Sequence, residues 1–247
     1  MNVSILQKGA VVMAGLFLAV SVHAGHPLIT EDSGTEGSGA SLLELTSEYS
    51  RIQNRSFSSS VLGVCATVTT GVTENLDVLL DLPFESCTEF FHNTHSSSTG
   101  LETPVLGAKW RFLEASPRLS FAVKSLISLP HFGQNITENS FYEMYLISSY
   151  AGNGFGIHTN AGYARAPGIN EEIWHASAAG EFAVGERITA VTNVSLDTPG
   201  SDNFITTLVG GVIYSVTDYF ALDFGVQTAI WDNQKDVTFL TGSAISF

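Results

Sequence analysis

Polar and apolar residues alternate with a period of two along most of this chain. The last stretch, Asp236 to Phe247, shows the pattern clearly, because apolar or small residues occupy every second position. Successive side chains of a strand point to opposite faces, so such alternation predicts a half-buried β-strand. The pattern begins at Ser41 and recurs in twelve segments, which are residues 41–50, 59–72, 76–86, 103–113, 119–130, 141–151, 154–165, 172–183, 187–197, 204–216, 219–230 and 236–247.

Short turns and longer polar loops alternate between the predicted strands. The short turns are Thr73–Asn75, Glu114–Arg118, Gly152–Asn153, Gly185–Glu186 and Thr217–Asp218, and the longer loops are Arg51–Ser58, Cys87–Glu102, His131–Ser140, Ala166–Glu171, Thr198–Asn203 and Trp231–Lys235. If both ends of the chain lie in the periplasm, every short turn falls on the periplasmic side, as in transmembrane barrels. An even number of strands can close such a barrel without free edges. We therefore predict an all-β fold for residues 41–247, a transmembrane antiparallel up-and-down β-barrel of about 12 strands.

The last predicted strand ends on an aromatic residue, Phe247. A closed barrel needs its last strand to pair with its first. We expect residues 236–247 to pair with residues 41–50 and to place Phe247 at the periplasmic boundary of the lipid.

Two segments precede the predicted barrel. An apolar run, Ala10 to Val22, follows Lys8 and leads to Val22-His23-Ala24, which has the form of a small-residue cleavage site. This pattern predicts a secretory signal peptide over residues 1–24, cleaved after Ala24, and export to the bacterial outer membrane. Residues 25–40 are Gly-rich, acidic and without periodicity, so we expect a flexible periplasmic segment.

Composition and charge narrow the possible partners. The formal net charge is −14 at pH 7, which argues against nucleic acid as a partner. Cys65 and Cys87 could form one disulfide in an oxidising compartment, but simple hairpin register puts Cys87 opposite Val61, so their pairing stays open. No second Cys or His lies at zinc-ligand spacing, and we expect no metal and no other cofactor.

Charged residues indicate which strand face lines the lumen. In the segment 103–113, Leu106 and Trp110 share one face, while Lys109 and Arg111 share the other. A Lys or Arg facing lipid at the bilayer midplane costs about 2–4 kcal/mol, so the charged face should point inward. The same rule gives a set of candidate lumen residues, which are Glu44, Glu48, Asp77, Asp81, Lys109, Arg111, Lys124, Glu143, His158, Glu181, Arg187 and Asp223. The segment 204–216 is apolar on both faces, which leaves its orientation open.

The predicted hairpin around the turn Glu114–Arg118 brings Lys109 nearly opposite Lys124. Like charges facing each other across strands are destabilising, and Asp77, Asp81 and Glu143 on flanking strands could counter them. One interpretation is a charged constriction, a basic patch flanked by acids that orients passing solutes. The other is a salt-bridge network that fills the barrel, and the two are compatible.

Two other functions fit parts of this pattern. In a membrane-embedded acyl hydrolase, His158 and Glu181 could pair across one hairpin, with Ser177 on the same face. However, these side chains are predicted to point inward, away from lipid, which favours a polar barrel lining. A non-conducting structural or adhesive barrel would use its loops, especially Cys87–Glu102, and would have a lumen blocked by side chains or by residues 25–39.

Several segments resemble one bacterial family. They are His26–Gly37, Gly71–Val78, Gly107–Phe112, Asn160–Tyr163, Trp174–Ala179 and Gly211–Leu222, and they are similar to outer-membrane transporters named after the meta-pathway of phenol degradation. The resemblance implies an outer-membrane barrel that passes aromatic or other hydrophobic compounds, and it supplies no catalytic motif. We therefore predict a channel in the outer membrane of a Gram-negative bacterium, for passive uptake of small, hydrophobic or aromatic molecules, and not an enzyme. Its partners would be outer-membrane lipid and small-molecule solutes, and the oligomeric state stays open.

Overall fold

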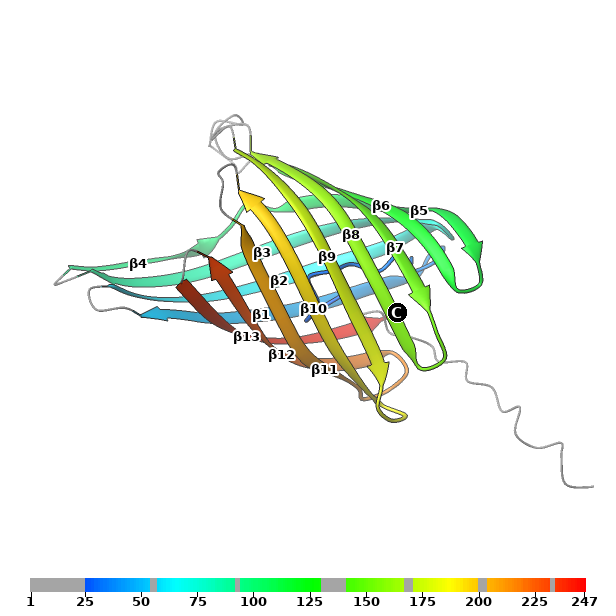
Figure 1. Cartoon of the computed structure of the whole chain (residues 1–247). Helices are drawn as coiled ribbons and strands as arrows, with labels where there is room; N and C mark the ends of the chain where they lie inside the picture. The colour runs from blue at the N-terminus through cyan, green and yellow to red at the C-terminus, as the bar shows by residue number, and fades with distance from the viewer. Residues whose placement is uncertain are drawn as a thin grey trace, which may run out of the picture.

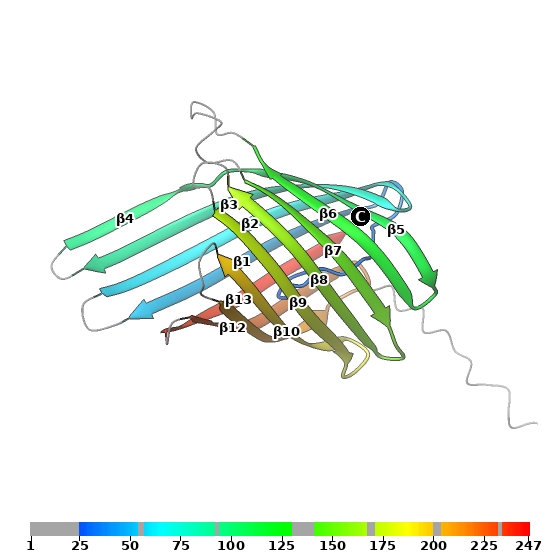
Figure 2. The same cartoon turned by 45° about the horizontal axis from the view of Figure 1, so that its top comes forward.

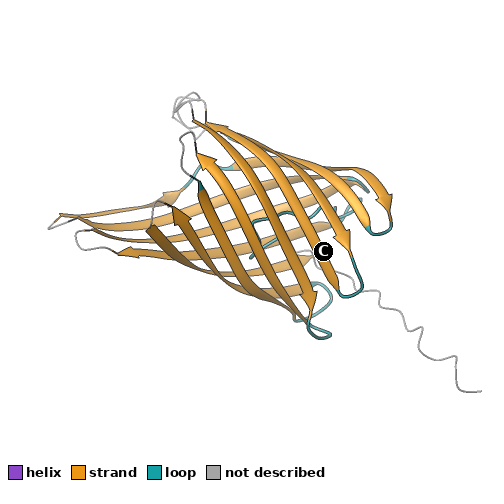
Figure 3. Cartoon of the chain, in the orientation of Figure 1, coloured by secondary structure: helices purple, strands orange, loops and turns teal. Residues whose placement is uncertain are grey.

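The computed structural model describes residues 25–53, 57–91, 94–129, 141–166, 171–199, 204–231 and 234–247. These residues form antiparallel strands joined by turns around a central lumen (Figures 1 and 3). In the described ranges, no helix is long and apolar enough to span a membrane. The predicted signal peptide and the whole of the predicted loop His131–Ser140 lie outside the described residues.

Within the described ranges, thirteen strand elements make up the sheet. They are β1 (Ser41–Gln53), β2 (Phe57–Thr73), β3 (Leu76–Phe91), β4 (Thr94–Leu101), β5 (Val105–Ser116), β6 (Leu119–Ser128), β7 (Tyr142–Ala151), β8 (Phe155–Ala166), β9 (Glu171–Ala183), β10 (Ile188–Pro199), β11 (Ile205–Ser215), β12 (Phe220–Trp231) and β13 (Gln234–Ser246). Each strand pairs with the next one along the chain, except that β5 pairs with β3, and β13 returns to β1. Twelve strands therefore close the barrel, as predicted, and β4 extends it as part of a hairpin with β3.

The closing seam joins the two strands that were expected to meet. β1 and β13 are antiparallel, with Leu42 opposite Ser246 and Ser50 opposite Thr238. Beyond this ladder, the backbones of Ser41 and Phe247 exchange two hydrogen bonds of 2.8 Å. Phe247 is 72% exposed on the outside of the barrel. The predicted pairing of the last strand with the first is confirmed.

The two faces of the strands differ in the predicted sense. On β5, Leu106 and Trp110 are exposed on the outer face, whereas Lys109 is buried on the inner face. β11, whose orientation the sequence left open, exposes Leu208 and Val212 and buries Val209 at 4% exposure. β11 is apolar on both faces because its inner face lies under another part of the chain, which is described below.

The predicted loop Cys87–Glu102 is wrong, because most of it is strand. β3 continues to Phe91, and β4 returns beside it with Leu101 opposite Phe84. The partner of β3 then changes to β5, where Val105 lies opposite Asp81. Residues 96–99 of β4, Ser-Ser-Ser-Thr, are all exposed, so no alternation of apolar residues marks this strand. Figures 1 and 2 show the far ends of β1 to β4 reaching beyond the other strands.

Both cysteines are free. They lie on the β2–β3 pair, where Cys87 faces Val61, as the hairpin register predicts, and Cys65 faces Pro83. The disulfide that the sequence left open is therefore not formed.

Candidate functional site: the lumen and its N-terminal segment

The sequence predicted a flexible periplasmic segment for residues 25–40, but these residues lie inside the barrel. We call them the luminal segment. The blue chain in Figure 2 runs within the ring of strands. Its backbone and side chains are hydrogen-bonded to inward-facing residues of β1, β3, β6, β7, β10 and β12. This corrects the expectation from sequence. The segment has no periodicity because, from Gly25 to Glu36, its backbone contacts go to separate polar groups on the wall. Strand-like backbone pairing, with Gly71, begins only at its end.

The first two residues of the luminal segment contact acids on the wall. The Gly25 backbone nitrogen donates to Glu44 Oε1 on β1 at 3.0 Å. His26 Nδ1 lies 2.5 Å from Asp223 Oδ1 on β12, and both side chains are largely buried. Glu44 and Asp223, both predicted to line the lumen, thus hold the start of the segment.

Pro27 and Leu28 make the apolar part of this contact. Pro27 is fully buried and lies against Gly211 on β11 and Gly225 on β12. A Cβ added at Gly211 or Gly225 would come within 3.0 or 2.9 Å of Pro27 carbons. Leu28 packs against the buried cluster that includes Ile213. The inner face of β11 is apolar because these two residues cover it.

The central residues of the luminal segment bind polar side chains of four strands. The Thr30 nitrogen donates to Asn193 Oδ1 on β10 at 2.8 Å, and the Ser33 nitrogen donates to Ser149 Oγ on β7 at 2.8 Å. The Ser33 hydroxyl also lies 2.6 Å from Ser120 Oγ on β6. In its hydrogen-bonding orientation, the Asn160 amide on β8 donates to the backbone oxygen of Glu31 at 2.9 Å and accepts from its nitrogen at 2.8 Å. Alternation places Asn193 on the inward face of its strand, as found, although its contact with Thr30 was not predicted. The other three wall residues were not predicted, since their pattern does not differ from that of other polar lining residues.

The predicted basic patch exists, and the luminal segment neutralises part of it. Lys109 on β5 faces Lys124 on β6, as expected. Lys124 forms an ion pair with Glu31 of the segment. Burial disfavours the charged form of Glu31, but the ammonium groups of Lys124 and Lys109 outweigh it and hold the pKa of Glu31 below its ordinary value. Glu31 is therefore a counter-charge that the sequence interpretation missed.

Acids on the wall contribute differently from expectation. Asp77 is fully buried, lies opposite Lys109 in register and accepts from the Glu36 nitrogen at 3.2 Å. Asp81 accepts instead from the Thr67 hydroxyl of β2 at 2.7 Å. Glu143, expected to counter the lysines, accepts from the Tyr145 hydroxyl at 2.7 Å. Of these three acids, only Asp77 has a described contact with the luminal segment.

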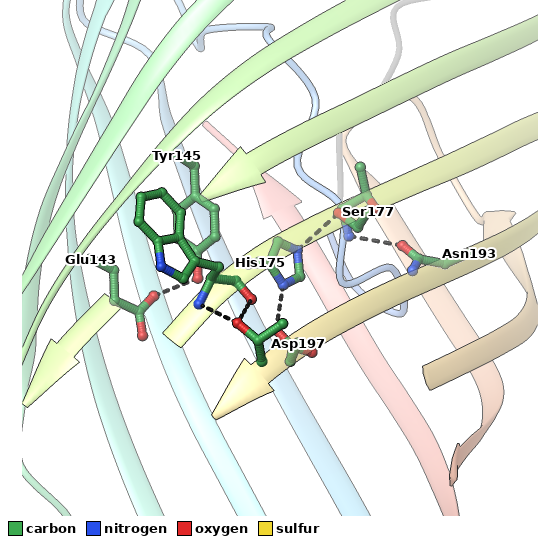
Figure 4. A network of polar contacts seen from close by, with 9 residues as sticks. Glu143, Tyr145, His175, Ser177, Asn193 and Asp197 are labelled. Atoms are coloured by element: carbon green, nitrogen blue, oxygen red, sulfur yellow. Dashed lines mark hydrogen bonds and ion pairs between the residues drawn. The ribbon is translucent and has the colours of Figure 1, made fainter. Parts of the chain in front are cut away.

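A polar network occupies the wall between β7 and β10 (Figure 4). His175 Nδ1 lies 2.7 Å from Asp197 Oδ1, and its Nε2 lies 2.9 Å from Ser177 Oγ. The Tyr145 ring meets the His175 ring edge-on at 5.5 Å. The sequence had paired Ser177 loosely with another histidine, so this Ser–His–Asp chain was not predicted.

His158 forms a second histidine contact. Its Nδ1 is 2.8 Å from Ser149 Oγ, and its Nε2 is 3.8 Å from Glu181 Oε2. His158 and Glu181 thus lie together as predicted. They also line a cavity of about 480 Å³ between Asp32–Gly34 of the luminal segment and the turns at the end of the barrel where Ser41 lies.

Three candidate residues do not join the luminal contacts described here. Arg111 reaches the turn before β3, where it donates to the Glu74 backbone oxygen at 3.0 Å. Arg187 is exposed beside the turn before β10, with Nη1 3.5 Å from the Val216 oxygen. Glu48 is exposed on β1. Alternation placed all three among the candidate lumen residues, but it gave no information on the turn contacts of Arg111 and Arg187.

Comparisons with solved structures identify the same architecture in other proteins. An outer membrane channel from Pseudomonas putida F1 is similar at 10% identity and a TM-score of 0.65, over 87% of this chain and 98% of that one. The KdgM porin is similar at 8% identity and a TM-score of 0.58, over 83% of this chain and 99% of that one. The CymD monoaromatic hydrocarbon channel is similar at 10% identity and a TM-score of 0.51, over 85% of this chain and 88% of that one. At these identities the likeness shows the fold.

Comparison with curated protein sequences gives no match. The family described as "Putative MetA-pathway of phenol degradation" matches residues 33–247, which is most of the chain and includes both the strands and part of the luminal segment. The resemblance carried by the turn and strand motifs is thereby confirmed, and the chain belongs to this phenol-degradation family of outer-membrane β-barrels.

Proposed function

We propose that this protein is a channel of the bacterial outer membrane for the passive uptake of small, hydrophobic or aromatic molecules. The observation that carries the proposal is a closed barrel with an apolar exposed exterior and a charged, polar interior. Such a barrel satisfies its backbone within lipid and encloses a path for solutes. Family membership supports the proposal, as do the similar folds of proteins described as channels and porins.

Lys109, Lys124 and Asp77 form the constriction in this proposal, together with Glu31 of the luminal segment. Their charges meet where the segment crosses the wall of β3, β5 and β6. A solute passes beside the segment or displaces it. The cavity next to Asp32–Gly34 is the vestibule on one side of this constriction.

Conductance in planar bilayers and solute-driven swelling of liposomes test the proposal. Wild-type protein should conduct, and deletion of residues 26–38 should raise its conductance several-fold, because the deletion removes the luminal segment and keeps all strands. Heat-modifiable gel mobility would verify that both barrels are folded. Folded wild-type and deletion proteins that both fail to conduct would overturn the channel.

A non-conducting structural barrel is the second candidate, and the luminal segment favours it. The segment has contacts with strands on several sides of the lumen, as a permanent closure would require. A wild-type protein that does not conduct, together with a deletion variant that does, would support this candidate over the passive channel.

The Ser177–His175–Asp197 chain is the observation that an acyl hydrolase would require. We propose that it is instead a polar lining, since all three side chains belong to the lumen wall and not to the exterior that faces lipid. Hydrolysis of short and long acyl esters by wild type should not exceed hydrolysis by Ser177→Ala. A loss of measurable hydrolysis in Ser177→Ala would reverse this assignment.

A further inference from the structure

The nitrogen of Gly25 is held at a defined point of the lumen wall. It donates to Glu44 Oε1 at 3.0 Å, and the Gly25 oxygen accepts from the Leu28 nitrogen at 2.9 Å. The two residues that follow are fixed by their own contacts, His26 with Asp223 and Pro27 by burial. The residues after Gly25 thus contribute to holding its nitrogen beside the carboxylate.

The sequence independently predicts that this nitrogen becomes the N-terminus. Cleavage after Ala24 adds water across the Ala24–Gly25 amide, and this hydrolysis is the work of a signal peptidase of the export machinery. Ala24 leaves with the carboxylate, and Gly25 keeps the nitrogen as an ammonium. A neutral peptide N–H with one proton thus becomes a cation with three donors.

We propose that Glu44 is the counter-ion of the mature N-terminus and that processing after Ala24 creates a luminal ion pair between the Gly25 ammonium and the Glu44 carboxylate. The residues around Glu44 favour such a pair. On the inner face, Leu42 and Ala244 beside it are 3% and 1% exposed. An unpaired carboxylate is costly in such surroundings, and a hydrogen bond between two ions is stronger than one from a neutral amide.

The ion pair gives processing a structural consequence. At its far end, the luminal segment is tied to the wall by the Gly39 nitrogen, which donates to the Gly71 oxygen at 2.9 Å. At its near end, the new ammonium binds Glu44. The segment is therefore anchored at both ends in the cleaved protein, whereas an uncleaved chain has a weaker amide contact at the near end.

Mass spectrometry of the protein purified from outer membranes tests the first step. The intact mass should correspond to residues 25–247, and a chain that starts at any other residue would overturn the proposal. Acetylation by an amine-reactive reagent then tests the ion pair. In the folded barrel, the α-amine of Gly25 should react about tenfold more slowly than after heat unfolding, in line with the strength of an ionic hydrogen bond.

Glu44→Gln should remove most of this protection, because it removes the charge and retains the side-chain shape. Glu48→Gln is the matched control, since Glu48 is on the same strand face but exposed, and it should leave the rate unchanged. Equal acetylation rates in wild type and folded Glu44→Gln would overturn the ion pair.

A second measurement on wild type needs no variant. The pH profile of acetylation should show the α-amine titrating above about 8, its ordinary upper value, because a neighbouring carboxylate favours the charged form. A midpoint at or below that value would overturn the proposal. None of these readouts involves flux, so they are independent of whether the barrel conducts.

Discussion

Pro27 fits against the barrel wall because two wall positions have no side chain. Gly225 is the more informative of the two, since an added Cβ there would meet Pro27 at 2.9 Å and Leu240 only at 3.4 Å. At Gly211 the added atom would also meet a backbone oxygen, that of Phe224, at 2.6 Å. A small change at Gly225 therefore acts on the luminal segment before it acts on the barrel.

Gly225→Ala should weaken the docking of the luminal segment by about 1–3 kcal/mol, the usual cost of adding a methyl group to a packed contact. Hydrogen exchange of residues 26–38, followed by mass spectrometry, should become faster, while the strands keep their protection. Gly210→Ala is the control, because nothing lies within 4 Å of an added Cβ there. Unchanged exchange in Gly225→Ala would contradict this account of the Pro27 contact.

Glu31→Gln should loosen the same segment by a different mechanism. It removes the ion pair with Lys124 and leaves two lysines facing each other across β5 and β6, at a cost of about 1.5–3 kcal/mol. Because the pKa of Glu31 is depressed in the folded protein, its contribution is fully present above the ordinary value of 4.5. It is lost as the pH falls through the depressed value.

Segment exchange, corrected for the intrinsic effect of pH, should therefore differ between wild type and Glu31→Gln at neutral pH and converge in acid. Glu48→Gln, which removes the charge of an exposed acid on β1, should behave like wild type at neutral and at acid pH. A difference that persists unchanged into strong acid would rule out the ion pair as its cause.

At the scale of elements, the strands differ in how well the alternation of polar and apolar residues predicts them. β5 could be oriented from sequence because two cations on one face exclude lipid. β11 could not, because its inner face is covered by Leu28 and Pro27, contacts with residues nearly two hundred positions earlier. β4 was missed for the opposite reason, since residues 96–99 are exposed and carry no apolar signal. Sequence periodicity thus orients a strand only where its two faces differ in polarity, and it does not reveal an exposed polar strand such as β4.

The outer part of the β3–β4 hairpin should be dispensable for barrel closure. Replacing residues 88–97 by Asn-Gly would join Cys87 to Ser98, which face each other, through a two-residue turn. The pairs of β3 with β5 lie below this point, from Leu76 to Asp81, so they stay intact. Heat-modifiable mobility should be retained with a transition within a few degrees of wild type. An unfolded product would show that residues 88–97 stabilise the closed ring.

At the scale of the whole molecule, alternation, charge and the even number of strands predict that the barrel closes and which strand faces line its lumen. They do not predict the contents of the lumen. Glu44, Asp77, Lys124 and Asp223 were predicted to face inward, yet each meets the luminal segment through contacts that no spacing in the sequence encodes. A segment without periodicity can be docked or free, and only the wall residues that surround it decide which.

The exterior of the barrel has to face lipid if this architecture is used in a membrane. Leu146, in the middle of β7, is 52% exposed on the outer face, whereas Leu101, on β4, is 68% exposed on the protruding hairpin. Leu146→Arg should destabilise the barrel in bilayers by about 2–4 kcal/mol, because the charge would sit in hydrocarbon. Leu101→Arg should cost less, because Leu101 belongs to the strand that is not part of the closed ring.

Urea titration of folding into lipid vesicles, read by gel mobility, would compare the two variants with wild type. Both leucines are exposed in the isolated molecule, so exposure alone predicts equal tolerance of arginine. A selective cost at Leu146 would therefore come from the bilayer. If both variants fold equally well, the outer face of β7 does not lie in the hydrocarbon.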